Sequence, residues 1–183
     1  MNATVDSALR LWGFEGAHWS LIAARENRVF QIITSDGARY ALRLHRQAFR
    51  SDAELSSELE WTRALAKGGL HVPAPIAALD GAYLHCVDDV QVDVLSWVPG
   101  AQLGETGQPL KLTNRSGVFS QIGLEMARLH RISDAWVPVN EFDRRSWDRD
   151  GLLREQPIWG RFWENPTLSA KDKALFIAAR DHA

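Results

Sequence analysis

The sequence predicts an α+β fold in which an antiparallel sheet with one long helix is followed by a helical part. Short apolar runs separated by tight turns fill the first half of the 183 residues. The Asp36-Gly37 pair between two of these runs is typical of a β-hairpin. Near Gly100 the pattern changes, and apolar residues then recur at helical spacing.

A short helix and two strands are expected first. Thr4 is the predicted N-cap of a helix that runs to Trp12, and Gly13 supplies its stop. The apolar-rich runs at residues 18–23 and 28–34 are suited to strands.

The second strand of the hairpin, predicted over residues 39–46, alternates clearly. Arg43 and His45 lie on one face, while Leu42 and Leu44 lie on the other. Because apolar side chains pack inward, the leucine face is expected to be the core side.

Residues 51–67 form the clearest predicted helix. Ser51 and Glu54 match the capping box, and two glycines follow the last residue. Glu58 lies at the edge of the apolar stripe of this helix.

An extended connector at residues 72–75 and further strands at 76–79, 83–87 and 90–98 complete the β-rich half. Helices are expected at residues 114–132 and 169–182. We therefore predict two parts, residues 1–97 and 98–183.

Composition and charge exclude several function classes. A formal net charge of -2 and a pI near 6.3 leave no basic footprint for nucleic acid or an anionic membrane. The apolar runs are shorter than a membrane helix needs, and the first residues lack a secretory pattern. The single cysteine, Cys86, excludes an internal disulfide framework and is expected to be a buried thiol. We expect a cytoplasmic protein with no nucleic-acid or membrane partner.

A cation on the hairpin and an acid on the long helix make the first candidate site. A cation that holds the phosphates of a nucleotide needs a fixed opposite charge behind it. Arg43 and Glu58 have the residue types and positions for such a pair. The alternative is a partly exposed surface salt bridge, worth about 0–1 kcal/mol.

The residues around this pair resemble a known family. Residues 40–43 read Tyr-Ala-Leu-Arg, the form of the kinase strand motif Val-Ala-Ile-Lys with arginine in place of lysine. Further pieces in the same order are ENRVF (26–30), SELEW (57–61), GLHVPAP (69–75), VDVLSWVPG (92–100) and MARLH (126–130). The chain resembles the protein-kinase-like aminoglycoside phosphotransferase and choline kinase family, and within it the bacterial homoserine-kinase-like and stress-response-kinase-like branch.

The resemblance implies a nucleotide grip built from four residues. Arg43 would hold the phosphates, and Glu58 would orient Arg43. Asn27 and Arg28, in the turn between the first two strands, would lie over the phosphates. A solvated turn is the alternative for these two.

The resemblance also implies a hinge and cofactors. Ser96, Trp97 and Val98 would join a kinase-like small lobe to a partial helical large lobe and meet the adenine edge. The end of a buried strand is the alternative for them. The implied donor is ATP or GTP, with Mg²⁺ as counter-ion.

The catalytic loop of the family, His-x-Asp-x-x-x-x-Asn, has no counterpart in the sequence. None of the 6 histidines has an aspartate two residues later. Asp148 and Asp150 resemble a metal-binding pair, but no buried strand precedes them, and we interpret them as a solvated loop. No catalytic or metal-ligating residue is therefore expected, and the chain is expected to be truncated before the loop.

The sequence thus predicts the nucleotide-binding part of an ATP-dependent phosphotransferase acting on a small-molecule hydroxyl. The alternative is a non-catalytic nucleotide-binding or protein-interaction module with a kinase-like small lobe. A helical lobe cut short would expose apolar surface around residues 175–177, and we expect self-association through it.

On this hypothesis the chain by itself transfers no phosphate, because it lacks the aspartate that positions the acceptor hydroxyl. The measurement is incubation with labelled ATP and a panel of amino alcohols and aminoglycosides. Labelled product above the rate without protein would contradict the hypothesis.

Overall fold

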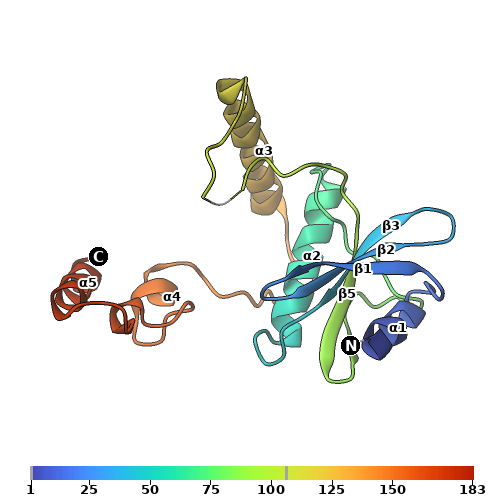
Figure 1. Cartoon of the computed structure of the whole chain (residues 1–183), viewed down its shortest axis with the longest axis horizontal. Coiled ribbons are helices and arrows are strands. Elements are labelled where there is room, and N and C mark those ends of the chain that lie inside the picture. The colour runs from blue at the N-terminus through green and yellow to red at the C-terminus, as the bar shows by residue number, and fades with distance from the viewer. Residues whose placement is uncertain (1, 106) are drawn as a thin grey trace. The chain divides into compact units, whose positions relative to one another are not determined.

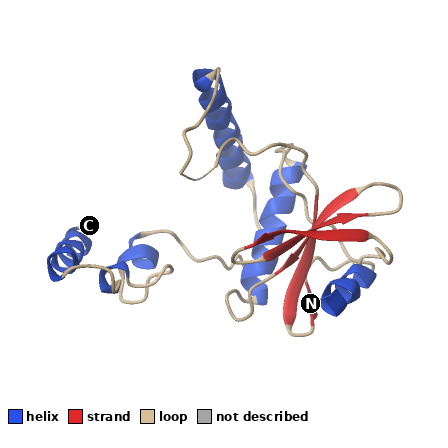
Figure 2. Cartoon of the chain, viewed as in Figure 1, coloured by secondary structure: helices blue, strands red, loops and turns tan. Residues whose placement is uncertain are grey.

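The computed structural model describes residues 2–105 and 107–183, and an antiparallel sheet organises the first part (Figure 1). The strands, in the spatial order β1-β2-β3-β5-β4, are β1 (His18–Ala24), β2 (Arg28–Ile33), β3 (Arg39–Leu44), β4 (His85–Val87) and β5 (Val90–Ser96). The helices are α1 (Asn2–Leu11), α2 (Asp52–Lys67), α3 (Arg115–Ala135), α4 (Arg149–Leu153) and α5 (Ala170–His182), with a 3-10 turn η1 at Phe162–Glu164 (Figure 2). The predicted α+β class is confirmed.

The chain forms two compact units, one ending at Phe142 and the other comprising Asp143–Ala183. The first contains the sheet with α1, α2 and α3, and the second contains α4 and α5. Strands give way to helices after Ser96, as the sequence predicts. The division into residues 1–97 and 98–183 stays a prediction.

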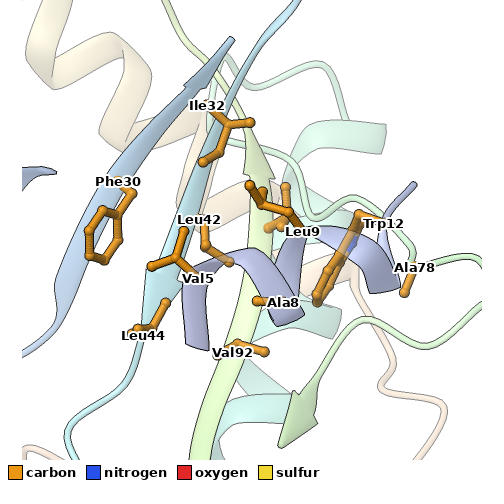
Figure 3. Packing of buried hydrophobic residues seen from close by; sticks show 11 residues of the cluster. Val5, Ala8, Leu9, Trp12, Phe30, Ile32, Leu42, Leu44, Ala78 and Val92 are labelled. Carbon is orange, nitrogen blue, oxygen red and sulfur yellow. The ribbon is translucent and has the colours of Figure 1, made fainter. Parts of the chain in front are cut away.

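Helix α1 covers one face of the sheet and forms the main core with it (Figure 3). The buried members of this core are Val5, Ala8, Leu9, Trp12, Phe30, Ile32, Leu42, Leu44, Ala78, Val92 and Val94. Leu42 and Leu44 therefore face the core, as their alternation predicts.

The expected N-cap of α1 is wrong. The helix begins at Asn2, so Thr4 lies inside it, and the Thr4 hydroxyl donates to Asp88 Oδ2 at 2.8 Å. The Thr4 hydroxyl thus binds a residue distant in the sequence instead of capping the helix. Gly13 follows the helix with φ +69°, a conformation that glycine adopts without steric cost.

Two local signals of the first half are confirmed. The β2–β3 hairpin turns at Asp36 and Gly37, with Thr34 N donating to Ala38 O at 3.0 Å. Helix α2 has the full capping box, in which Glu54 N donates to the Ser51 hydroxyl and Ser51 N donates to the Glu54 carboxylate, both at 3.0 Å.

Two expectations about the following segment are wrong. Residues 76–79 form no strand, because Pro75 makes only an isolated bridge to Leu95 and Ala78 N turns back to Ala82 O. Proline has no N–H with which to extend a ladder. Cys86 is exposed rather than buried, since β4 is an edge strand.

The second unit packs around one buried aromatic residue, Trp163. The Arg180 guanidinium of α5 lies 4.6 Å from the centre of its ring, and Phe162 makes an edge contact with it at 5.0 Å. Asp148 and Asp150 are exposed, and Asp148 caps the start of α4.

Within residues 2–105 and 107–183, every helix falls short of the combined length and apolarity that a membrane crossing requires.

Replacing Leu42 with alanine tests the core. Leu42 is fully buried, so the variant loses apolar burial and leaves a cavity, and unfolding in urea should show a loss of about 2–5 kcal/mol. Leu21→Ala is the matched control, because Leu21 of β1 is 48% exposed. Equal losses for the two variants would contradict this placement of the core.

Candidate functional site

Arg43 projects from the face of the sheet opposite α1. It pairs in register with Val29 of β2 and Asp93 of β5, while Leu42 and Leu44 on either side point into the core. Because side chains alternate along a strand, Arg43 faces away from α1.

Glu58 of α2 meets Arg43 on this face. Arg43 Nη1 donates to Glu58 Oε1 at 2.8 Å, and the two side chains are 16% and 27% exposed. The capping box sets where α2 begins, and the buried Leu55 and Leu59 fix which side of it faces the protein. The pair that the sequence predicted is therefore formed, and it is largely shielded from solvent.

Asp93 is the residue that the sequence reasoning missed. Its side chain is 0% exposed and accepts from Arg43 Nε at 2.7 Å and from Arg43 Nη2 at 2.8 Å. His45 Nε2 lies 2.7 Å from Asp93 Oδ2, the oxygen that also accepts from Arg43 Nη2. A single acid between Val92 and Val94 in an apolar strand was the available signal, since a buried charge requires a partner.

The charges in this cluster stabilise one another. Burial alone would raise the pKa of Asp93, but the hydrogen bonds and charges of His45 and Arg43 outweigh it and the pKa is lowered. Burial alone would lower the pKa of Arg43, yet Asp93 first and Glu58 second raise it. Asp93 is therefore an ionised acceptor, and His45 Nε2 donates to it.

The predicted hinge residues lie at the end of β5. Ser96 is tied to the connector, because its N–H donates to Ala74 O at 2.7 Å and its hydroxyl accepts from Ala74 N at 2.8 Å. Trp97 lies under the Arg39 guanidinium, 5.7 Å from the ring centre, and Val98 is 39% exposed. Their contact with adenine stays a prediction.

The two predicted turn residues are not brought to Arg43. Arg28 pairs in register with Leu44, so it starts from the face that α1 covers. It lines a cavity of about 620 Å³ together with Thr4 of α1. Asn27 stays in the turn between β1 and β2, where its carbonyl accepts from Arg25 N at 3.1 Å. Their role over the phosphates stays a prediction.

Comparison with known proteins shows that the chain is similar to two kinases. No family model matches the chain. Amicoumacin kinase of Bacillus subtilis (strain 168) is 26% identical over 149 residues, 78% of this chain and 42% of that protein. The structure of the microcompartment-associated aminopropanol kinase matches 99% of this chain and 55% of that chain, with a TM-score of 0.80 and 28% identity. The chain is similar to kinases of the protein-kinase-like aminoglycoside phosphotransferase family.

Two further solved structures share the fold. An amicoumacin kinase in complex with AMP-PNP, Ca²⁺ and Ami matches 99% of this chain and 51% of that chain, with a TM-score of 0.76 and 19% identity. A spectinomycin phosphotransferase matches 75% of this chain with a TM-score of 0.52 and 16% identity. The chain thus spans 42% of the Bacillus subtilis amicoumacin kinase and 55% and 51% of the two kinase structures. The branch to which it belongs stays a prediction.

Acid should expose the contribution of Asp93 to stability. Its folded-state pKa lies below the ordinary value of 3.8, so the folded protein binds this proton less readily than the unfolded chain. The contribution is therefore complete above that ordinary value and is lost as the pH falls through the folded-state pKa. Unfolding in urea is measured from pH 6 down to about pH 3. Over this range we expect the free energy of unfolding to fall less in Asp93→Asn than in the unmodified protein.

Asp134→Asn is the control, because Asp134 of α3 is exposed. An Asp93→Asn protein that loses stability with acid as steeply as the unmodified protein would contradict the assignment.

Proposed function

We propose that the chain is the nucleotide-binding part of an ATP-dependent phosphotransferase that acts on a hydroxyl group of a small molecule. The observation that carries the proposal is the Arg43 guanidinium, anchored by Glu58 of α2 and Asp93 of β5. Relatives named as kinases of amicoumacin and aminopropanol support it.

Arg43 has the donors that phosphate recognition needs. A guanidinium offers five N–H groups in one plane, and Nε, Nη1 and Nη2 each use one in the three hydrogen bonds to the carboxylates. One N–H on each terminal nitrogen remains, and such a fork matches two phosphate oxygens. Ala41, two residues earlier on the same face, is small enough to leave room for the nucleotide.

In the proposed hinge, Ser96 holds the connector rather than the nucleotide. Its N–H and its hydroxyl are both hydrogen-bonded to the backbone of Ala74. The backbone of Trp97 and Val98 is then the part of the hinge that would meet the adenine edge.

A divalent cation, Mg²⁺ in the proposal, would neutralise charge on the phosphates when bound. In the described part of the chain, no three His, Cys, Asp or Glu side chains are grouped to hold one. The complex of amicoumacin kinase with AMP-PNP and Ca²⁺ supports a nucleotide with a divalent ion for the family. The part of this chain in the reaction is therefore to hold the nucleotide.

A non-catalytic interaction module is the second candidate. One observation favours it: two carboxylates, Glu58 and Asp93, surround a single guanidinium. One positive and two negative charges leave a net negative charge beside the place of the phosphates, which weakens their attraction.

A cytoplasmic location, ATP or GTP as the donor, and a small molecule as the acceptor remain part of the proposal. Self-association does too, and Leu175, Phe176 and Ile177 of α5 are exposed as it requires. Light scattering at rising protein concentration tests it.

The test of the function is calorimetric titration of the chain with AMP-PNP and Mg²⁺. Arg43→Ala should weaken binding by about 10- to 100-fold, because a charge-assisted hydrogen bond contributes about 1.5–3 kcal/mol. Glu58→Ala should weaken it less, since Asp93 still holds the guanidinium.

Arg128→Ala is the matched control, because it removes the same charge and breaks an exposed ion pair to Glu125 at 2.9 Å. An unmodified chain that binds no nucleotide would favour the interaction module. Equal binding by the Arg43 and Arg128 variants would show that the nucleotide lies elsewhere.

A further inference from the structure

Arginine in place of the lysine of the kinase strand motif needs hydrogen-bond acceptors around it in different positions. An ammonium has three donors on one nitrogen, whereas a guanidinium has five spread over three nitrogens in a rigid plane. Glu58 accepts from Nη1. The Nε side of the plane lies over the sheet, and without an acceptor there its N–H groups would be unsatisfied.

Asp93 is placed to satisfy that side. It lies directly across from Arg43 in the β3–β5 register and takes both Nε and Nη2 in a bidentate pair at 2.7 and 2.8 Å. Two parallel hydrogen bonds fix the plane of a guanidinium, whereas the single bond to Glu58 leaves rotation about its own axis.

His45 in turn holds Asp93. It lies two residues after Arg43 on the same face of the chain, and its Nε2 is 2.7 Å from Asp93 Oδ2. Both side chains are buried, at 4% and 0% exposed, so solvent does not compete for this contact. Arg43 and His45 therefore share Asp93 Oδ2, and Arg43 alone holds Oδ1.

Stability alone gives no reason for this arrangement. Replacing a buried ion pair with packed apolar residues is often neutral or stabilising, and apolar pairs already fill the other face of the same two strands, at Leu42 with Val94 and Leu44 with Val92. What the charged pair adds is a fixed direction for Arg43.

We propose that Asp93 and His45 are positioning residues that hold the Arg43 guanidinium in the orientation in which its remaining N–H groups meet the nucleotide phosphates. Arg43 and Asp93 then form a matched pair that replaces the lysine of the motif. This inference rests on the proposed function, and it names residues that act on the nucleotide only through Arg43.

The test measures AMP-PNP affinity at 25 °C, in the presence of Mg²⁺, and melting temperature for each variant. Asp93→Asn and His45→Phe should each weaken nucleotide binding by about tenfold, because each removes a charge-assisted contact that orients Arg43. His45→Gln, which keeps a donor, should bind more tightly than His45→Phe. Arg43→Lys should bind weakly, since it leaves Asp93 without its bidentate partner.

The double variant Arg43→Lys with Asp93→Asn decides whether the pair is matched. A lysine at position 43 needs Glu58 as its partner and has no use for the buried charge of Asp93. The double variant should therefore bind AMP-PNP at least about tenfold more tightly than Arg43→Lys alone. Losses that simply add would overturn the matched pair.

Three outcomes separate the inference from the proposed function. If the unmodified chain binds and Arg43→Ala does not, while Asp93→Asn and His45→Phe bind normally with lower melting temperatures, the inference is overturned and the function stands. If affinity falls in the positioning variants as expected, both stand.

If the unmodified chain binds no nucleotide, the proposed function fails. The ¹⁵N-resolved NMR signal of the Arg43 Nε–H group then tests whether Asp93 and His45 hold the guanidinium in place. A slowly exchanging signal that is lost in His45→Phe supports it. A rapidly exchanging signal in the unmodified chain overturns it.

Discussion

The buried carboxylate of Asp93 is the constraint on which the site depends. An ionised group with no solvent exposure must be met by donors, and Arg43 and His45 supply three of them. Meeting that demand fixes the alignment of β3 with β5 and the plane of the Arg43 guanidinium. Glu58 then joins the same guanidinium to α2, so one cluster links two strands and a helix.

The two faces of the sheet have separate tasks. One face packs against α1 through apolar side chains and supplies the burial that stabilises the fold. The other carries Arg43, Asp93 and His45 toward α2. Because side chains alternate with a period of two, a slip of one residue between β3 and β5 would exchange these faces. The apolar core and the polar cluster therefore require the same register.

Local chemistry made much of the fold predictable. The Asp36-Gly37 turn and the capping box at Ser51 act within a few residues, so their signals survive without any knowledge of the fold. Expectations failed where tertiary structure decides the environment of a residue. The Thr4 hydroxyl donates to Asp88 instead of capping a helix, and Cys86 is exposed because its strand lies at the edge of the sheet.

The sequence by itself determined the α+β class, the two faces of β3 and the pairing of Arg43 with Glu58, because these follow from periodicity and from a motif read in order. Only the tertiary structure decided that Asp93 completes the pair, since it lies 50 residues from Arg43 and becomes its neighbour through strand pairing. It also placed Arg28 on the face opposite Arg43, because the register of β2 against β3 sets which way that side chain starts. Cross-strand neighbours are chosen by register, and register is settled only when the whole sheet packs.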